Sequence, residues 1–171
     1  MSVTISQETP LQDDVRAMIA ELDAAMREQE PDTPDEFNFP MTAEEMAGPE
    51  TTVFVARSGG EALGCGALRE LGDGLAEVKR LYVRTAARGT GLAARLIATV
   101  EAHAREAGFS RLALETGLDY HAARKAYERA GFQRCGAFGD YPDNPYCAFY
   151  EKLLVPAART PDHTPDFEAT R

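Results

Sequence analysis

The feature of this sequence that most restricts its fold is a run of three strand-like segments separated by short glycine turns. The segments are residues 51–58, 61–70 and 75–83, and the turns are Gly-Gly at 59–60 and Gly-Asp-Gly at 72–74. Tight turns of this composition are typical of antiparallel hairpins. The run therefore predicts a three-stranded meander, and the remaining elements must pack against a sheet.

Helical periodicity marks the segments on either side of the meander. Apolar residues recur at helical spacing from Leu11 to Met26, and again from Leu92 to Ala104, and a third helix is predicted at 120–130. Further strands are predicted at 2–8, 111–116, 132–138 and 146–154. Helices that cross between strands require parallel pairs, whereas the meander requires antiparallel ones. The order predicts an α/β fold with a mixed, twisted sheet flanked by helices.

The chain length of 171 residues suits one domain with one core. We expect a single domain over residues 1–155. The acidic, proline-rich segment 28–50 lacks Lys and Arg and is predicted to be loop, with a short helix near Ala43–Met46. Residues 156–171 carry three prolines and one large apolar residue, Phe167, so we expect a flexible C-terminal tail.

Composition excludes several function classes. A net charge of −10 argues against sequence-independent nucleic-acid binding, and no apolar run reaches the length of a membrane span. The N-terminus lacks a secretory signal, and the three widely spaced cysteines are interpreted as reduced thiols, so we expect a cytoplasmic protein. No pair of histidines has metal-ligand spacing, and we expect no metal. Cys65 is interpreted as a small core residue.

A glycine loop joins the end of the meander to the following helix. Its residues Arg88, Gly89, Thr90 and Gly91 lie between a predicted strand and a predicted helix, where backbone N–H groups are unpaired. Glycines allow a phosphate to approach the backbone, but they also serve a turn that needs only tightness. Both interpretations remain open at this point. The loop is neither a P-loop nor a complete dinucleotide-binding fingerprint, because Ala94 takes the third glycine position.

Several motifs together resemble the GNAT superfamily of N-acetyltransferases. Arg88-x-x-Gly91-x-Ala93 resembles its coenzyme-A signature, (Gln/Arg)-x-x-Gly-x-(Gly/Ala). Ala123-x-x-x-Tyr127 followed by Gly131-Phe132 resembles its closing motif, and AEVKRLYV, LALET and FYEKLL resemble its fourth, fifth and last strands. The matches span residues 76–154 in the family's order.

The resemblance implies a GNAT fold, with a sheet of about seven strands that splays between the fourth and fifth, flanked by about four helices. It also implies acetyl-CoA as the acetyl donor and a primary amine as the acceptor. The combination of motifs resembles small stand-alone bacterial members, which favours a small-molecule acceptor. Family members often dimerise, so a homodimer stays open.

The resemblance further implies roles for individual residues. Glu77 matches a general base, and Tyr127 matches a tyrosine that protonates the leaving sulfur. Strand alternation places Glu77, Lys79, Leu81 and Val83 on one face and Val78, Arg80 and Tyr82 on the other. The residues implied to bind the donor are Leu81, Tyr82, Val83, Arg88, Gly89, Thr90, Gly91, Leu92 and Ala93. Alternatively, Glu77 pairs with Lys79 or with a cross-strand partner, and Tyr127 is a packed core residue.

One position departs from the family pattern. Many members carry Asn seven residues before the tyrosine, and this chain has Tyr120, with Thr116 or His121 as substitutes. The acceptor site is implied to lie between residues 11–50 and 139–145, which are rich in acids and aromatics: Glu44, Glu45, Asp140, Asp143, Phe37, Phe39 and Tyr141. That composition suits a cationic amine or a solvated acidic loop. A non-catalytic acetyl-CoA sensor and a domain for another phosphate ligand remain alternatives.

Overall fold

A computed structural model describes residues 2–155, so the tail expected at 156–171 lies outside the described residues. The elements, in chain order, are β1 (Thr4–Gln7), α1 (Asp13–Gln29), η1 (Asp35–Phe37), α2 (Ala43–Met46), β2 (Thr51–Ser58), β3 (Glu61–Gly72), β4 (Leu75–Val83), η2 (Thr85–Ala87), α3 (Leu92–Glu106), β5 (Arg111–Gly117), α4 (His121–Arg129), β6 (Gln133–Cys135) and β7 (Cys147–Leu153). Within residues 2–155 the predicted order of strands and helices is confirmed.

The strands form one mixed sheet. Its seven strands lie in the order β1-β2-β3-β4-β5-β7-β6, and β2, β3 and β4 form the predicted antiparallel meander. Only β4 and β5 pair in parallel, because α3 carries the chain back across the sheet between them. The predicted α/β fold with a mixed sheet and flanking helices is therefore correct.

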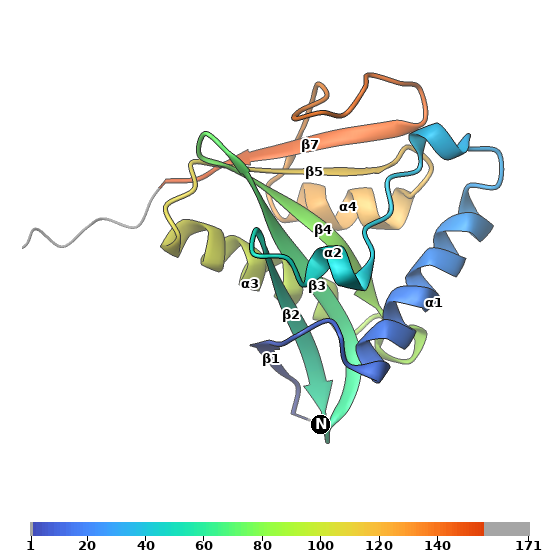
Figure 1. The fold of residues 1–171 in the computed structure, drawn as a ribbon, viewed down its shortest axis with the longest axis vertical. Coiled ribbons are helices and arrows are strands. Elements are labelled where there is room, and N and C mark those ends of the chain that lie inside the picture. The colour runs from blue at the N-terminus through green and yellow to red at the C-terminus, as the bar shows by residue number, and fades with distance from the viewer. Residues whose placement is uncertain (1, 156–171) are drawn as a thin grey trace, which may run out of the picture.

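The parallel pair separates part-way along its length. Pairing of β4 with β5 runs from Leu75 and Arg111 to Val78 and Leu114, and it stops there. Beyond that point β4 stays with β3, while β5 stays with β7 down to Gly117. The two halves of the sheet diverge visibly in Figure 1. The expected splay between the fourth and fifth strands is present.

Helices cover the two faces of the sheet in separate layers. On one face α1 and α2 pack against β2 and β3 through a core of Val15, Met18, Ile19, Met41, Met46, Val53, Val55 and Cys65. On the opposite face α3 and α4 pack against the sheet through Val78, Ile97, Val100, Leu112, Leu114, Tyr127, Phe132 and Tyr150. Figure 1 shows α1 and α2 in front of the sheet and α3 and α4 behind it.

The alternation predicted for β4 is wrong beyond Lys79. Arg80 has a φ of +53°, and the register between β3 and β4 shifts beside it. One extra residue of this kind forms a bulge, and it exchanges the faces of all residues that follow. Leu81 and Val83 consequently pack towards α3, whereas Tyr82 packs in the core beneath α1.

Contacts from α1 and β3 hold the bulge. The Arg80 side chain is buried, and its guanidinium donates to an Asp23 carboxylate oxygen at 2.5 Å. The Cys65 thiol donates to the Arg80 carbonyl oxygen at 3.4 Å. A left-handed backbone at a bulky residue costs free energy, so its surroundings must compensate. The ion pair with Asp23 links that strained residue to α1.

Two smaller expectations have different outcomes. The short helix expected near Ala43–Met46 is confirmed, and it begins with a capping box in which Thr42 and Glu45 satisfy each other's backbone N–H groups. The strand expected at 132–138 is wrong in its length, because only Gln133–Cys135 pair with β7. The chain then turns so that Phe138 packs on Tyr141 and Phe149.

Asp23→Ala tests the role of the ion pair at the bulge. Removing the carboxylate leaves a buried guanidinium without its ionic partner, which typically costs about 3 kcal/mol. We expect a lower free energy of unfolding by that amount in chemical denaturation. Glu28→Ala, at an exposed position of the same helix, removes the same charge and should change stability by less than about 0.5 kcal/mol. Equal effects of the two variants would contradict this account.

Candidate active site

The N-terminus of α3 has no side-chain cap and is suited to binding an anion. Gly91 is its N-cap residue, no side chain caps the helix, and its first turn contains no acid. Gly89 and Gly91 have φ angles of 75° and 81°, and an added Cβ at either would meet no atom within 4 Å. The backbone of both glycines is therefore open on that side, and the first N–H groups of a helix have no partner within the helix. Such groups bind phosphate oxygens through hydrogen bonds and the helix dipole, so these residues fit a diphosphate.

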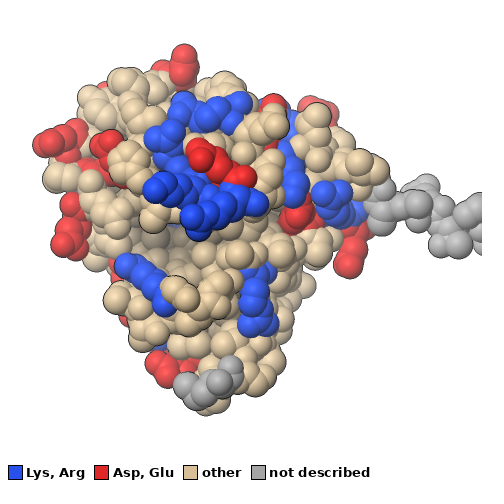
Figure 2. All heavy atoms as spheres, turned by 180° about the vertical axis from the view of Figure 1, so that it is seen from behind, with Lys and Arg blue, Asp and Glu red and all other residues tan. Residues whose placement is uncertain are grey.

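Positive charge gathers around this helix end. Residues 84–95 contain Arg84, Arg88 and Arg95 and no acid, although the whole chain has a net charge of −10. The Arg88 guanidinium donates to the Val83 carbonyl oxygen at 3.2 Å, which fixes its side chain beside the loop. Figure 2 shows that Lys and Arg gather on the face opposite to that of Figure 1, where α3 and α4 lie.

A small cavity occupies the gap where β4 and β5 diverge. Its volume is about 130 Å³, and it lies between these strands, α1 and α4. Leu81 and Tyr127, two of the predicted site residues, line it. The Tyr127 ring also packs edge-on against Phe132 with centroids 6.0 Å apart. Tyr127 is thus both a core residue and a cavity residue, and burial raises the pKa of its hydroxyl well above the ordinary value.

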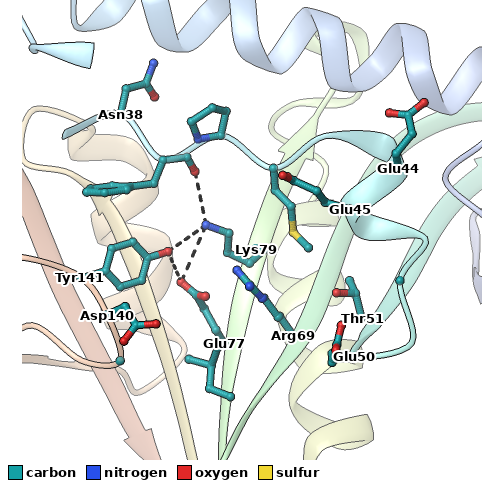
Figure 3. Close-up of a pocket in the computed structure, with 16 residues that line it drawn as sticks. Asn38, Glu44, Glu45, Glu50, Thr51, Arg69, Glu77, Lys79, Asp140 and Tyr141 are labelled. Atoms are coloured by element: carbon teal, nitrogen blue, oxygen red, sulfur yellow. Dashed lines mark hydrogen bonds and ion pairs between the residues drawn. The ribbon is translucent and has the colours of Figure 1, made fainter. Parts of the chain in front are cut away.

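Glu77 lies in the wall of a second, larger cavity of about 650 Å³. The Tyr141 hydroxyl donates to Glu77 Oε2 at 2.5 Å, and the Lys79 ammonium lies 3.9 Å from the same oxygen. Lys79 Nζ also donates to the Tyr141 oxygen at 2.8 Å, so the three side chains form one network (Figure 3). Burial raises the pKa of Glu77, and Lys79 and Tyr141 oppose that rise.

Comparison with known sequences agrees with this geometry. The sequence pattern of the acetyltransferase (GNAT) family matches residues 16–132, which include the helix end, the strand gap and Glu77. The chain belongs to the acetyltransferase (GNAT) family.

Relatives and solved structures support the same family assignment. The chain is 41% identical over 155 residues to an IAA acetyltransferase of Azospirillum brasilense, covering 90% of this chain and 99% of the relative. It is 36% identical over 124 residues to the N-acetyltransferase YsnE of Bacillus subtilis, covering 71% and 82%. A crystal structure of a Klebsiella pneumoniae protein assigned to the acyl-CoA N-acyltransferases superposes with a TM-score of 0.76 at 35% identity, covering 90% and 98%.

The predicted acid and base of this GNAT chain belong to different cavities. Glu77 lines the larger cavity, whereas Tyr127 lines the smaller one between the strands. Lys79 lines both, as do Asn38 and Phe39. Because Lys79 is the first residue of β4 beyond the end of its pairing with β5, it stands at the junction of the two spaces.

The other residues predicted to bind acetyl-CoA follow one another along the chain from β4 to the start of α3. Leu81 faces the gap, Tyr82 and Val83 continue β4 beyond it, and the segment from Arg88 to Ala93 leads into α3. The Thr90 hydroxyl donates to the Ala87 carbonyl oxygen at 2.6 Å, which ties the loop together. The main-chain edge of β4 from residue 79 to 83 has no strand partner on the side of β5.

The regions predicted to form the acceptor site converge on the larger cavity. Nine residues of the segment 38–51 and all three of 139–141 line it together with Glu77, including Phe39, Glu44, Glu45, Asp140 and Tyr141. Phe37 and Asp143 do not line it. Phe39 and Tyr141 meet edge-to-face with centroids 4.9 Å apart, so the wall beside the Glu77 network is aromatic.

Sequence reasoning missed several groups in these walls. Lys79 was considered only as an alternative partner of Glu77, although its position two residues along the strand placed it on the same face. The hydroxyl of Tyr120 is buried without a hydrogen-bond partner among residues 2–155, and it lines the strand gap together with Thr116. His121 is exposed and does not line the gap. Tyr120 therefore offers a free hydroxyl where the family pattern has an amide.

The other residues considered in the sequence, Cys65 and His103, have structural roles. Cys65 is fully buried, and burial raises the pKa of its thiol to about 12, as expected of an inert core residue. His103 packs edge-on against Phe54. In the described part of the chain, no three His, Cys, Asp or Glu side chains are grouped to hold a metal ion. None of the helices between residues 2 and 155 has the length and apolarity to cross a membrane.

Glu30, at the end of α1, is an acid that the sequence did not single out. It lines the small cavity, and its carboxylate lies so close to Gly117 that a side chain there would overlap it. Burial first, and then the charges of Glu115 and Asp119, raise the pKa of Glu30 to about 7. Between pH 4.5, the ordinary pKa, and about pH 7, the folded protein keeps a proton on Glu30 that the unfolded protein has lost. Stability from this group therefore falls as pH rises through that window.

Glu30→Gln tests this linkage. The amide cannot ionise, so the variant should gain thermal stability over the wild-type protein at pH 8. The difference in melting temperature should shrink towards pH 5, where the wild-type carboxyl is already protonated in the folded state. Glu28→Gln is the matched exposed control on the same helix, and its effect should not vary with pH. A difference for Glu30→Gln that is the same at both pH values would refute the shifted pKa.

Proposed function

We propose that residues 1–155 form one catalytic domain that transfers an acetyl group from acetyl-CoA to a primary amine of a small-molecule acceptor. The observation that carries this proposal is an uncapped helix end placed beside a strand gap in one chain. The helix end suits the diphosphate of the donor, and the gap suits its extended thioester arm. A Bacillus subtilis acetyltransferase was solved in complex with CoA, and this chain shares its fold with a TM-score of 0.64 at 14% identity.

The donor would be held mainly by the protein backbone. Arg88 and the N–H groups of Gly89, Thr90, Gly91, Leu92 and Ala93 would bind the diphosphate. The unpaired main-chain edge of β4, at Leu81, Tyr82 and Val83, would bind the arm as an added strand does. This arrangement explains why small side chains occupy the loop, since the backbone performs the binding.

The reaction forms one bond and breaks another. The donor supplies an acetyl thioester, so a C–N bond forms at the carbonyl carbon while the C–S bond breaks. Glu77 accepts the proton that the amine loses, directly or through water, and Tyr127 donates a proton to the departing sulfur. The products are an amide and free coenzyme A, and exchange with solvent restores both side chains. A backbone N–H of β4 would stabilise the oxyanion.

The environments of the two groups suit these roles. The raised pKa of Glu77 makes it a stronger base than an exposed glutamate, and the charge of Lys79 opposes that rise. The raised pKa of Tyr127 keeps its hydroxyl protonated and ready to donate. Glu77 lines the larger cavity and Tyr127 the smaller one, and Lys79 lines both.

Two measurements test this proposal. The first is turnover of a panel of primary amines, monitored as the free thiol released from acetyl-CoA. The second is the variant Glu77→Gln, which tests the general base. General-base catalysis is worth about 100-fold or more, so we expect kcat to fall by at least that factor at pH 7. The deficit should shrink near pH 9.5, where the free amine no longer needs a base. A wild-type pH–rate profile in the variant would rule out this role. Tight binding of acetyl-CoA without thiol release would instead favour a sensor.

Tyr127→Phe tests the proton donor. The phenyl ring keeps the packing against Phe132 and removes only the hydroxyl. We expect kcat to fall about 10- to 100-fold, with less than a twofold change in the Kd of acetyl-CoA measured by calorimetry. Tyr146→Phe, which removes a hydroxyl from a tyrosine outside both cavities, serves as the control. An unchanged kcat in Tyr127→Phe would leave the tyrosine a purely structural role.

A further inference from the structure

The wall of the larger cavity contains an arginine, Arg69, whose charge acts on Glu77 and Tyr141 without direct contact. Arg69 lies on β3 directly opposite Glu77 on β4, and its side chain is exposed to the cavity. Its guanidinium makes no hydrogen bond or ion pair with any residue between 2 and 155. Figure 3 shows it facing into the cavity beside Lys79 and Glu77. In contrast, Arg57 binds Glu8 and Asp14, and other arginines of the chain are similarly paired.

No carboxylate of the same cavity forms an ion pair with Arg69 within the described residues, although the charge of Arg69 lowers the pKa of Glu77. Glu77 is occupied by Tyr141 and Lys79. Glu44 binds Arg16 at 2.5 Å, and Glu45 accepts the backbone N–H of Thr42 in the capping box of α2. Within the described chain, Arg69 therefore remains a cation that is open to a ligand, although five acids line the cavity around it.

We propose that the acceptor is an amine that also carries a carboxylate, in the manner of a small amino acid with an apolar side chain. This inference rests on the proposed function, and it assigns the chemistry of the acceptor. Arg69 would bind the carboxylate, because a guanidinium presents paired N–H groups that match two carboxylate oxygens. The amine would then point at the Glu77 and Tyr141 pair, on the neighbouring strand.

Apolar side chains and two cations in the wall of the cavity suit this class of acceptor. Phe39, Met41 and Leu71 line the cavity beside the charged groups and provide an apolar surface for a side chain. Arg69 and Lys79 both line this cavity, where they would repel the additional positive charges of a polyamine. An amino acid is neutral overall, and it satisfies both the free guanidinium and the carboxylate of Glu77.

Matched pairs of amines that differ only in the carboxylate provide the experiment. Phenylalanine is compared with phenethylamine, and leucine with 3-methylbutylamine, in the wild-type protein and in Arg69→Gln. We expect the wild-type kcat/KM to favour the carboxylate-bearing member by about tenfold or more, mainly through KM. Arg69→Gln should abolish that preference, because the KM of the carboxylate-bearing amines should rise to that of the plain amines. Arg27→Gln removes an exposed arginine that lines neither cavity, and it should retain the preference.

The outcomes separate this inference from the proposed function. If plain amines react as well as their carboxylate partners, or if Arg69→Gln keeps the preference, the inference is overturned and the acetyltransferase assignment stands. If no member of the panel reacts, calorimetric binding of phenylalanine to the CoA-saturated protein decides, and binding that does not depend on Arg69 overturns the inference. Failure of the protein to bind acetyl-CoA would instead overturn the proposed function itself.

Discussion

The point where β4 stops pairing with β5 is the constraint on which the rest of the site depends. Parallel pairing ends at Val78 and Leu114, and each strand then follows its other neighbour. Backbone N–H and C=O groups need partners when they are removed from water, so an open strand edge inside the molecule invites a ligand with its own amide groups. The anion-binding start of α3 follows β4 directly, so one continuous segment of backbone could hold both the diphosphate and the arm of the donor.

The bulge at Arg80 connects this opening to the acceptor side. Its reversed backbone directs Leu81 and Val83 towards α3 and leaves Arg80 in the layer of α1, where Asp23 binds it. Just before the bulge, Lys79 touches both cavities and belongs to the Glu77 and Tyr141 network. Changes in α1 therefore bear on the geometry of the strand gap even where they contact no ligand.

The face of α3 and α4 (Figure 2) and the larger cavity present different sets of charged side chains. The chain as a whole is acidic, yet the face of α3 and α4 gathers its Lys and Arg side chains, as an anionic donor requires (Figure 2). The larger cavity is lined by five acids and by two cations, Arg69 and Lys79. This separation would allow the donor and the acceptor to reach the reaction centre from different directions without competing for the same groups.

The sequence by itself determined the order of elements, the meander, the glycine loop and the family, because turn chemistry, periodicity and short motifs act within a few residues. It also identified the two acceptor segments and Glu77 as candidates. Only the tertiary structure decided the contact of Tyr141 with Glu77, since these residues are 64 positions apart and meet through the sheet order. The bulge at Arg80 and the free guanidinium of Arg69 were likewise beyond local patterns. Both depend on which strands and helices pack around the residue. Residue spacing along the chain does not determine that packing.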